Sequence, residues 1–599
     1  MIKKYNLIQT VAIAFVFIFL LNSCGGSGGN KPDERQAKGN VFYGGVFKSN
    51  EVEGFTSLYP HSITDVVSHR IANQIFEGLI KLSQKDLSIL PGIAEKWDKN
   101  EDATVWTFYL RKGVAFHDDP CFRDGKGREI DANDFKYSFT KLCEPGSNNK
   151  LFSTTFKDRV VGANEYFESV KKNKPLADGL EGVKVIDKYT LQINLTSPFS
   201  GFLNLLTTPA GWVFAKEAVE KYGEEVRTRA IGTGPFRVKS IKEGESVILD
   251  RNPNYWDIDQ FGNQLPYLDA LNISFVKEKR SEFMQFKKGN LDMIFRLPIE
   301  FIPEILGDLN NANAKDKNKN FSMQVMPAMS TFFLGFQNQL PPFNKKEVRL
   351  AFNQAIDREK MATYTLQGEG IPAIYGFVPP SYGPYNHSAI KGFTYNPDAA
   401  KKLLAKAGYP NGKGFPNLTL QINAGGGDRN IQIAEVVQKM LKENLNIDVE
   451  INVLPLVEHR ETIERGQVNF WRMSWIGDYP DPETFLTLFY GAIVPDSIGQ
   501  LSSPNTCRFK NARFDSLFVA ALKENDTKRR FDFYRQADQI IIDEAACMPI
   551  FYDENYRLLQ NNVRNFDANA MEYRDFTRVY FDRTDSKKKV ETAAKDTTK

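Results

Sequence analysis

Strand-like and helix-like segments alternate along residues 41–583, and this alternation limits the fold more than any other feature of the sequence. Segments with apolar residues at every second position have the period of a strand with one buried face: 189–195, 246–252, 271–276 and 418–423. Segments 347–362 and 434–445 instead repeat apolar residues every three or four positions, as an amphipathic helix does. Segment 397–408 begins with a proline and ends on a glycine, which are the usual start and stop of a helix. Mixed elements over this length predict α/β lobes, and no repeat of solenoid period is present.

The first residues of the chain are typical of an export signal that ends at a lipid attachment site. Lys3 and Lys4 precede an apolar stretch over residues 7–21, which has the length of a signal-peptide core and is short for a membrane span. A small residue then stands directly before Cys24, a pattern that resembles a bacterial lipobox, where cleavage before the cysteine exposes a thiol that is acylated. We therefore expect residues 1–23 to be a lipoprotein signal peptide and Cys24 to carry lipid. An uncleaved anchor helix is the alternative.

Two segments are predicted to have no fold of their own. Residues 24–40 are rich in glycine and charge, as in a flexible tether, and residues 584–599 form a charged, low-complexity tail. No later stretch is long and apolar enough to cross a bilayer. The chain is therefore predicted to be an exported protein of the periplasm or cell envelope, held at a membrane by its lipid.

Composition and charge exclude several classes of protein. Hydrophobic residues make up 42% and charged residues 25% of the 599 residues, as in an ordinary globular protein of several lobes. A net charge of +3 with mixed signs argues against a nucleic-acid partner, which requires a concentrated basic face. Aromatic residues at 13% mostly fill cores, and they also suit a cleft lined by rings.

The cysteines and histidines show no metal or redox pattern. No CxxC or HExxH spacing occurs, so we expect no metal site and no cofactor. Cys121 and Cys143 bracket one local segment and are a possible disulfide pair, although buried free thiols are an equal alternative. No catalytic nucleophile motif appears, and the glycine-rich turn in 423–438 lacks the known phosphate-binding patterns.

Six blocks of sequence together resemble one family, the extracellular solute-binding proteins of ABC importers that take oligopeptides, dipeptides or nickel. The blocks include "TFYLRKGVAFHD", "IGTGPFRVKS…RNPNYW" and "SWIGDYPDPETF", and they occur in the family's order. They lie at residues 67–118, 130–142, 231–256, 341–361, 395–412 and 474–485. One departure is the segment 119–129, which is longer than the usual turn.

The resemblance implies a two-lobed periplasmic-binding-protein fold of type II, with a hinge between α/β lobes and an additional domain in lobe one. By matching blocks, we expect lobe one over 41–297 and 553–583, with the additional domain at about 86–208. Lobe two is expected over 298–552. A ligand that contacts both lobes would favour the closed state.

The resemblance also implies which residues meet the ligand. In peptide-binding relatives the aspartate of a W-x-x-D turn pairs with the ligand's ammonium, and Asp478 stands at that position after Trp475, which could form an apolar wall. Arg472 lies where some relatives bind the ligand's carboxylate, although a structural ion pair is the alternative. Tyr479 lies in the same turn and is included in the predicted site, whereas Asp481 is expected only to shape the turn.

Three further expectations follow from this resemblance. The chain is expected to be a monomeric, non-enzymatic receptor that captures small peptides and delivers them to an ABC permease. A nickel-chelate, haem or an oligosaccharide is the alternative cargo, and an exported hydrolase or a surface interaction protein is the alternative class. Segments 57–59 and 233–236 are further candidates near the cleft, with no contact assigned.

Overall fold

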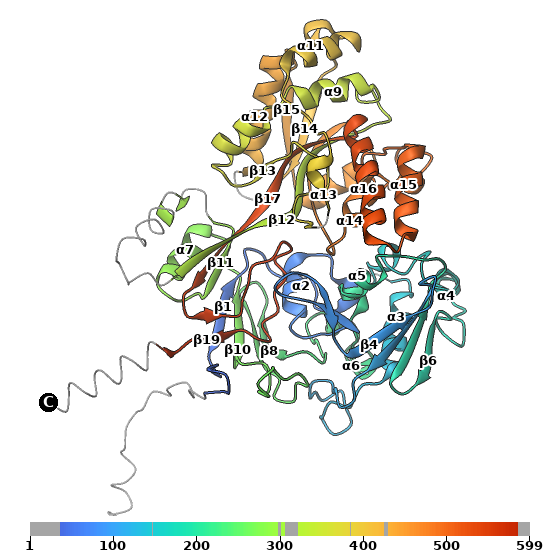
Figure 1. The fold of residues 1–599 in the computed structure, drawn as a ribbon, viewed down its shortest axis with the longest axis vertical. Coiled ribbons are helices and arrows are strands. Elements are labelled where there is room, and N and C mark those ends of the chain that lie inside the picture. The colour runs from blue at the N-terminus through green and yellow to red at the C-terminus, as the bar shows by residue number, and fades with distance from the viewer. Residues whose placement is uncertain are drawn as a thin grey trace, which may run out of the picture.

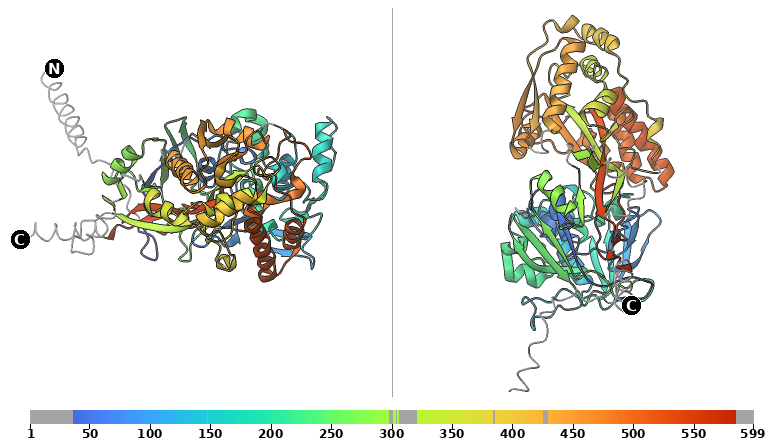
Figure 2. Two further views of the ribbon diagram at one scale, coloured as in Figure 1. Left: turned by 90° about the horizontal axis from the view of Figure 1, so that it is seen from above. Right: turned by 90° about the vertical axis from the view of Figure 1, so that its left-hand side faces the viewer.

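The computed structural model describes residues 36–584 except 147, 298–300, 303, 306–320, 384 and 425–428. The predicted signal peptide, Cys24, most of the tether, the tail from residue 585 and the core of the glycine-rich turn lie outside the described residues. Figure 1 shows two lobes, one above the other, and the side view in Figure 2 shows the same arrangement. Lobe one, below, contains residues 36–295 and 561–584, and lobe two, above, contains residues 337–546.

Two long antiparallel strands join the lobes: β12 (Phe321–Phe336) and β17 (Cys547–Gln560). Their lower halves pair from Phe321 to Pro327, and the pairing resumes with shifted register at Thr331. The predicted lobe boundaries stay predictions, because one seven-stranded sheet continues through these two strands from lobe to lobe. We call β12 and β17 the hinge strands.

The main sheet of lobe one has the strand order β1–β10–β9–β8. Its strands are β1 (Val46–Asn50), β8 (Phe236–Lys242), β9 (Ser246–Arg251) and β10 (Ala270–Ser274). Only the β1–β10 pair is parallel within this sheet. Smaller elements complete the lobe: α2 (Val66–Ala72), α6 (Lys216–Tyr222), α7 (Lys279–Lys287), β2 (Ile80–Leu82), β3 (Ile89–Pro91), β18 (Val563–Arg564) and β19 (Tyr580–Phe581).

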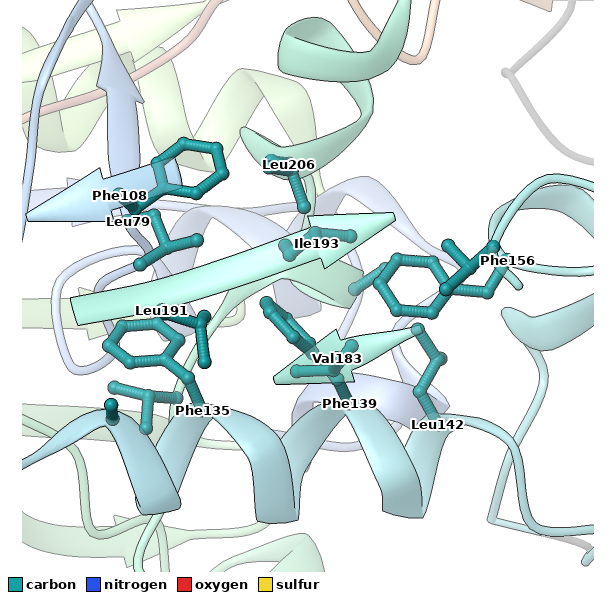
Figure 3. Close-up of a cluster of buried hydrophobic side chains, with 14 of the residues drawn as sticks. Leu79, Phe108, Phe135, Phe139, Leu142, Phe156, Val183, Leu191, Ile193 and Leu206 are labelled. Carbon is teal, nitrogen blue, oxygen red and sulfur yellow. The ribbon is translucent and has the colours of Figure 1, made fainter. Parts of the chain in front are cut away.

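A second sheet in lobe one, with the order β4–β5–β7–β6, lies within the predicted additional domain. Its elements are β4 (Ala94–Lys99), β5 (Val105–Leu110), β6 (Val183–Asp187), β7 (Thr190–Asn194), α3 (Ala132–Leu142), α4 (Ala163–Lys171) and α5 (Phe202–Leu206). Helix α3 begins where Asp131 caps it in a capping box with Asp134. Figure 3 shows Phe135 and Phe139 of this helix pointing at the strand that carries Ile193, so the helix covers one face of the sheet.

Lobe two is built on the sheet order β11–β17–β12–β16–β14–β15, with β13 beside β17. Its strands other than the hinge strands are β11 (Met293–Phe295, at the lobe-one end), β13 (Ile371–Pro372), β14 (Leu418–Asn423), β15 (Val449–Leu454) and β16 (Phe470–Ile476). Its helices are α9 (Lys346–Gln354), α10 (Arg358–Lys360), α11 (Pro397–Lys406), α12 (Arg429–Leu445), α13 (Leu456–Glu464), α14 (Glu483–Leu486), α15 (Ala512–Lys523) and α16 (Thr527–Asp543).

The predicted helix over 347–362 is interrupted. Helix α9 ends at Gln354, and Asp357 then caps a new short helix by accepting a hydrogen bond from the Lys360 amide at 2.9 Å. An aspartate that binds a backbone amide favours a helix start, which overrides the continuing apolar pattern.

The four described cysteines Cys121, Cys143, Cys507 and Cys547 are free thiols, so the structure has no Cys121–Cys143 disulfide. Cys143 is buried where α3 ends, whereas Cys121 lies in a loop beside Asp119. Among the described residues, no helix has the length and apolar character to cross a membrane.

A chain of buried charges ties the C-terminal segment to a hinge strand. Arg574 pairs with Glu51 and, at 3.0 Å, with Glu572, and Glu572 lies 3.6 Å from Arg557 of β17. Arg70 also pairs with Glu51 at 3.0 Å. This network fixes the lower end of the hinge in lobe one.

Both ends of the described chain lie at the end of lobe one that faces away from lobe two (Figure 1). A Cβ on Gly45 would lie 2.7 Å from the ring of Phe581, so the first and last strands of lobe one are in close contact there.

Candidate functional site

The turn after β16, residues 477–484, lies against a hinge strand. The Gly477 amide donates to the carbonyl of Met329 in β12 at 2.9 Å. A Cβ at Gly477 would lie 3.0 Å from both the Met329 and Phe485 side chains, so a larger residue would require these side chains to shift. The turn is therefore placed at the boundary between the lobes.

Hydrogen bonds within the turn hold its shape. The Asp478 amide donates to Thr484 Oγ1 at 3.2 Å, and the Glu483 amide donates to Asp481 Oδ1 at 3.0 Å. From outside the turn, the Tyr382 hydroxyl donates to the Asp481 carbonyl at 2.7 Å. Such a turn presents its side chains before any ligand arrives, which lowers the ordering cost of binding.

Asp481 is already paired. Its carboxylate lies 2.9 Å from Arg530 of α16, and only 1% of its side chain is exposed. Burial raises the pKa of Asp481, and the Arg530 guanidinium opposes that shift. This geometry agrees with the expectation that Asp481 shapes the turn.

Asp478 has no cationic partner among the residues that the structure describes. Its one side-chain hydrogen bond is weak, from the Thr484 hydroxyl at 3.5 Å. The residue is exposed to solvent, yet desolvation by the surrounding protein raises the pKa of Asp478 to about 6. The carboxylate is thus available to a cation from outside the chain.

Tyr479 does not present its hydroxyl to a ligand. Its side chain is 8% exposed, and the hydroxyl donates to the carboxylate of Glu483. The structure therefore gives Tyr479 a role inside the turn, while its predicted contact with ligand stays a prediction.

Trp475 is half-buried on β16, directly opposite Thr331 of the hinge strand. Its ring packs against the core that includes Met329 and Phe485. The indole Nε1 is buried and has no hydrogen-bond partner within the described part of the chain. The ring thus forms an apolar wall next to the turn, and its indole N–H is an unpartnered hydrogen-bond donor among the described residues.

Arg472 is held without an ion pair among the described residues. Its guanidinium donates to Asn423 Oδ1 at 2.8 Å and Ser474 Oγ at 2.6 Å, and it lies 4.6 Å over the ring of Phe332. Burial lowers the pKa of Arg472 to about 10, opposed by the charge of Asp553. Its Nε is buried and has no hydrogen-bond partner among the described residues, so this donor is not used within that part of the chain.

Sequence reasoning missed a group of charges on the hinge beside Arg472. Asp553 of β17 pairs with Arg429 at 3.1 Å and lies 4.0 Å from Arg296, which directly follows β11. Both arginines are close enough to lower the pKa of Arg472. No local motif marks these residues, since they converge only through the fold.

The other candidates from sequence serve lobe one itself. The Thr233 hydroxyl is buried and donates to Glu77 at 2.9 Å, and the Ser57 amide donates to Ser68 Oγ at 3.2 Å. A small cavity of about 20 Å³ lined by Glu77 and Tyr255, among others, also lies within lobe one. It has room for about one water molecule and is too small for a solute.

Comparisons with known proteins agree over most of the chain. A family model described as "Bacterial extracellular solute-binding proteins, family 5 Middle" matches residues 88–493. The periplasmic oligopeptide-binding protein OppA of Escherichia coli (strain K12) is 29% identical over 512 residues, which cover 84% of this chain and 86% of that relative.

Two solved structures are similar to the fold. One is the ABC transporter-associated periplasmic binding protein DppA from Helicobacter pylori in complex with peptide STSA, with a TM-score of 0.73 at 23% identity over 90% of this chain and 98% of that chain. The other is the Escherichia coli murein tripeptide binding protein MppA, with a TM-score of 0.73 at 24% identity over 90% of this chain and 99% of that chain. These structures confirm the predicted two-lobed α/β fold.

Proposed function

Because the chain belongs to the bacterial extracellular solute-binding proteins of family 5, we propose that it captures short peptides between its lobes and delivers them to an ABC permease. The relative OppA is an oligopeptide-binding protein, and the two similar structures are of peptide-binding proteins. These relatives are binding proteins, and we propose the same non-enzymatic role for this chain.

The observation that carries the proposal is the unpaired carboxylate of Asp478. Its neighbour Asp481 has Arg530, whereas no described cation accompanies Asp478. A poorly solvated carboxylate gains most from a cation that brings its own hydrogen-bond donors, and the α-ammonium of a peptide is such a group. The position beside the hinge strand lets that contact bias the lobes toward closure.

Arg472 is the proposed partner of the carboxylate at the other end of a peptide. The Nε of the Arg472 guanidinium has no hydrogen-bond partner among the described residues, and a guanidinium is a group that suits a carboxylate. Five residues of strand and turn lie between Arg472 and Asp478, so the two residues are at most about 20 Å apart along a fully extended chain. A peptide of up to about five residues spans that distance, so the spacing favours short ligands.

Export and lipid attachment are part of the same proposal. Relatives such as OppA of Escherichia coli are periplasmic, and the N-terminal pattern ending at Cys24 supports cleavage and acylation. A lipid at this position would keep the receptor near the permease.

The test is peptide binding by calorimetry, after mass spectrometry has identified what co-purifies with the native protein. We expect mixed short peptides, and trialanine binding that Asp478→Asn weakens by at least about 2 kcal/mol through loss of a desolvated charge partner. Asp496→Asn, a change at an exposed aspartate, is the control and should bind as the natural chain does. A co-purified sugar or metal chelate, or unchanged affinity in Asp478→Asn, would contradict the proposal.

A further inference from the structure

The turn that carries Asp478 is touched by a side chain from the other lobe. Arg159 lies in the predicted additional domain, and its Nη2 is 3.9 Å from the Glu483 carboxylate of lobe two. The side chain of Glu483 is only 4% exposed, and that of Arg159 is 26% exposed. Within the described residues, Arg159 is the one cation within ion-pair distance of Glu483.

Arg159 is oriented by its own domain. Its Nη1 donates to the carbonyls of Thr154 at 2.7 Å and Thr155 at 3.0 Å, and the guanidinium lies 4.9 Å over the ring of Phe199. These contacts orient Nη2 toward lobe two, so the pair with Glu483 costs little further side-chain entropy.

A second contact fixes the two bodies at the same place. The Ser200 amide donates to the carbonyl of Leu522 at 3.0 Å, and the Ser200 hydroxyl reaches the carbonyl of Ala521 at 3.5 Å. Leu522 packs against the cores of both the additional domain and lobe two. The approach of Arg159 to Glu483 is therefore part of a formed interface.

Glu483 connects this interface to the ligand turn. Its carboxylate accepts the Tyr479 hydroxyl, and the next residue, Thr484, is the hydrogen-bond partner of Asp478. The charged and titratable groups that influence Glu483 or its partners come from three places: the turn itself (Asp478, Tyr479, Asp481), lobe two around it (Tyr382, Arg530, Tyr534) and the additional domain (Arg159). Burial raises the pKa of Glu483, and Arg159 opposes this shift more than any other group.

We propose that Arg159 is a positioning residue of the peptide site: by pairing with Glu483 it holds the Tyr479–Glu483 contact, and thereby the turn that presents Asp478. This inference rests on the proposed function of Asp478. It assigns the additional domain a part in ligand binding although Arg159 itself touches no ligand.

Removing Arg159 has two possible effects on peptide affinity, and because they have opposite signs, a binding experiment can distinguish them. If Arg159 acted only through the long-range electrostatic effect of its positive charge, its removal would reduce repulsion of the peptide ammonium, and the affinity for the peptide would rise. If it positions the turn through ionised Glu483, affinity falls. The fall is largest at low pH, where Glu483 without its partner becomes protonated, and it shrinks as rising pH ionises Glu483 again.

The experiment is trialanine calorimetry on the full chain at pH 6.5 and 8.5. We expect Arg159→Gln to weaken binding about five- to tenfold at pH 6.5 and less at pH 8.5, as for coupled neighbours in one network. Arg159→Lys should recover part of the loss, and Arg159→Gln should add nothing in a Glu483→Gln background. Arg123→Gln, at an exposed arginine of the same domain, is the matched control. Binding by Arg159→Gln that equals the control at both pH values, or is tighter, would overturn the inference.

A ligand-free measurement separates this failure from failure of the proposed function. Arg159→Gln should lower the thermal midpoint of unfolding more at pH 8 than at pH 5. In a Glu483→Gln background, this difference between the two pH values should vanish. If Asp478→Asn leaves affinity unchanged, the proposed function fails and the ligand role of Arg159 fails with it. If Asp478→Asn abolishes binding while Arg159→Gln matches its control, only the inference about Arg159 is wrong.

Discussion

Two aspartates three positions apart show how strongly one neighbour determines a residue's role. Asp481 has Arg530 at 2.9 Å and stabilises the turn. Asp478 has no cation among the residues described, and desolvation raises its pKa to about 6. The sequence places both carboxylates in the same turn, and only the position of Arg530 on a distant helix distinguishes them.

This contrast makes a prediction about stability without ligand. A carboxyl whose pKa is raised on folding contributes stability that is present below its unfolded value and is lost as pH rises through about 6. Asp478→Asn removes the ionised group, so its thermal midpoint should exceed that of the natural chain at pH 8 and converge with it near pH 4. Differential scanning calorimetry measures this, with Asp496→Asn as control. A lower midpoint for Asp478→Asn at pH 8 would show that the ligand-free carboxylate is stabilising.

At the scale of elements, the buried charges below the hinge connect strand β17 to the C-terminal segment. Glu572 lies between Arg574 and Arg557, and both its partners are 1–2% exposed. Although burial raises the pKa of Glu572, Arg574 and Arg557 outweigh burial and lower it. Removing one member of such a network leaves buried charge without compensation.

Glu572→Gln should therefore lower the free energy of unfolding by about 3 kcal/mol at pH 7, as for a broken buried pair. Because the folded-state pKa of Glu572 is lowered, the stability it contributes exists above its unfolded value and is lost on acidification, so the loss caused by the mutation should shrink below about pH 4. Urea unfolding at pH 7 and below about pH 4 measures the change in the free energy of unfolding. Glu168→Gln, which affects only an exposed pair with Lys171, should change stability by less than about 0.5 kcal/mol. Equal effects of the two mutations would contradict the role of the network.

Local elements were predictable from sequence where local signals determine them. Helix α11 begins at Pro397 as its pattern predicts, strand β14 coincides with 418–423, and the helix over 347–362 differs only where Asp357 starts a new helix. Arg159, Arg296 and Asp553 could not be found in this way, because each meets its partner across more than 100 residues of chain. The orientation of Tyr479 toward Glu483 likewise depends on how the turn packs.

At the scale of the molecule, two hinge strands and an interface through the additional domain connect the described parts of the two lobes, and Leu82 and Leu87 of lobe one also pack into the core of lobe two. A ligand bound to both lobes shifts such a molecule toward closure by its difference in affinity for the two states. Trialanine should therefore decrease the radius of gyration measured by small-angle X-ray scattering. Trialanine should leave the radius of gyration of Asp478→Asn unchanged. A decrease in both proteins would show that closure does not depend on the contact with Asp478.

The two ends of the described chain meet at the far side of lobe one, beside Gly45 and Phe581. If Cys24 carries the proposed lipid, attachment to the membrane acts through lobe one only. Lobe two would then carry no mechanical load from the membrane, and the anchor would not oppose its rotation about β12 and β17.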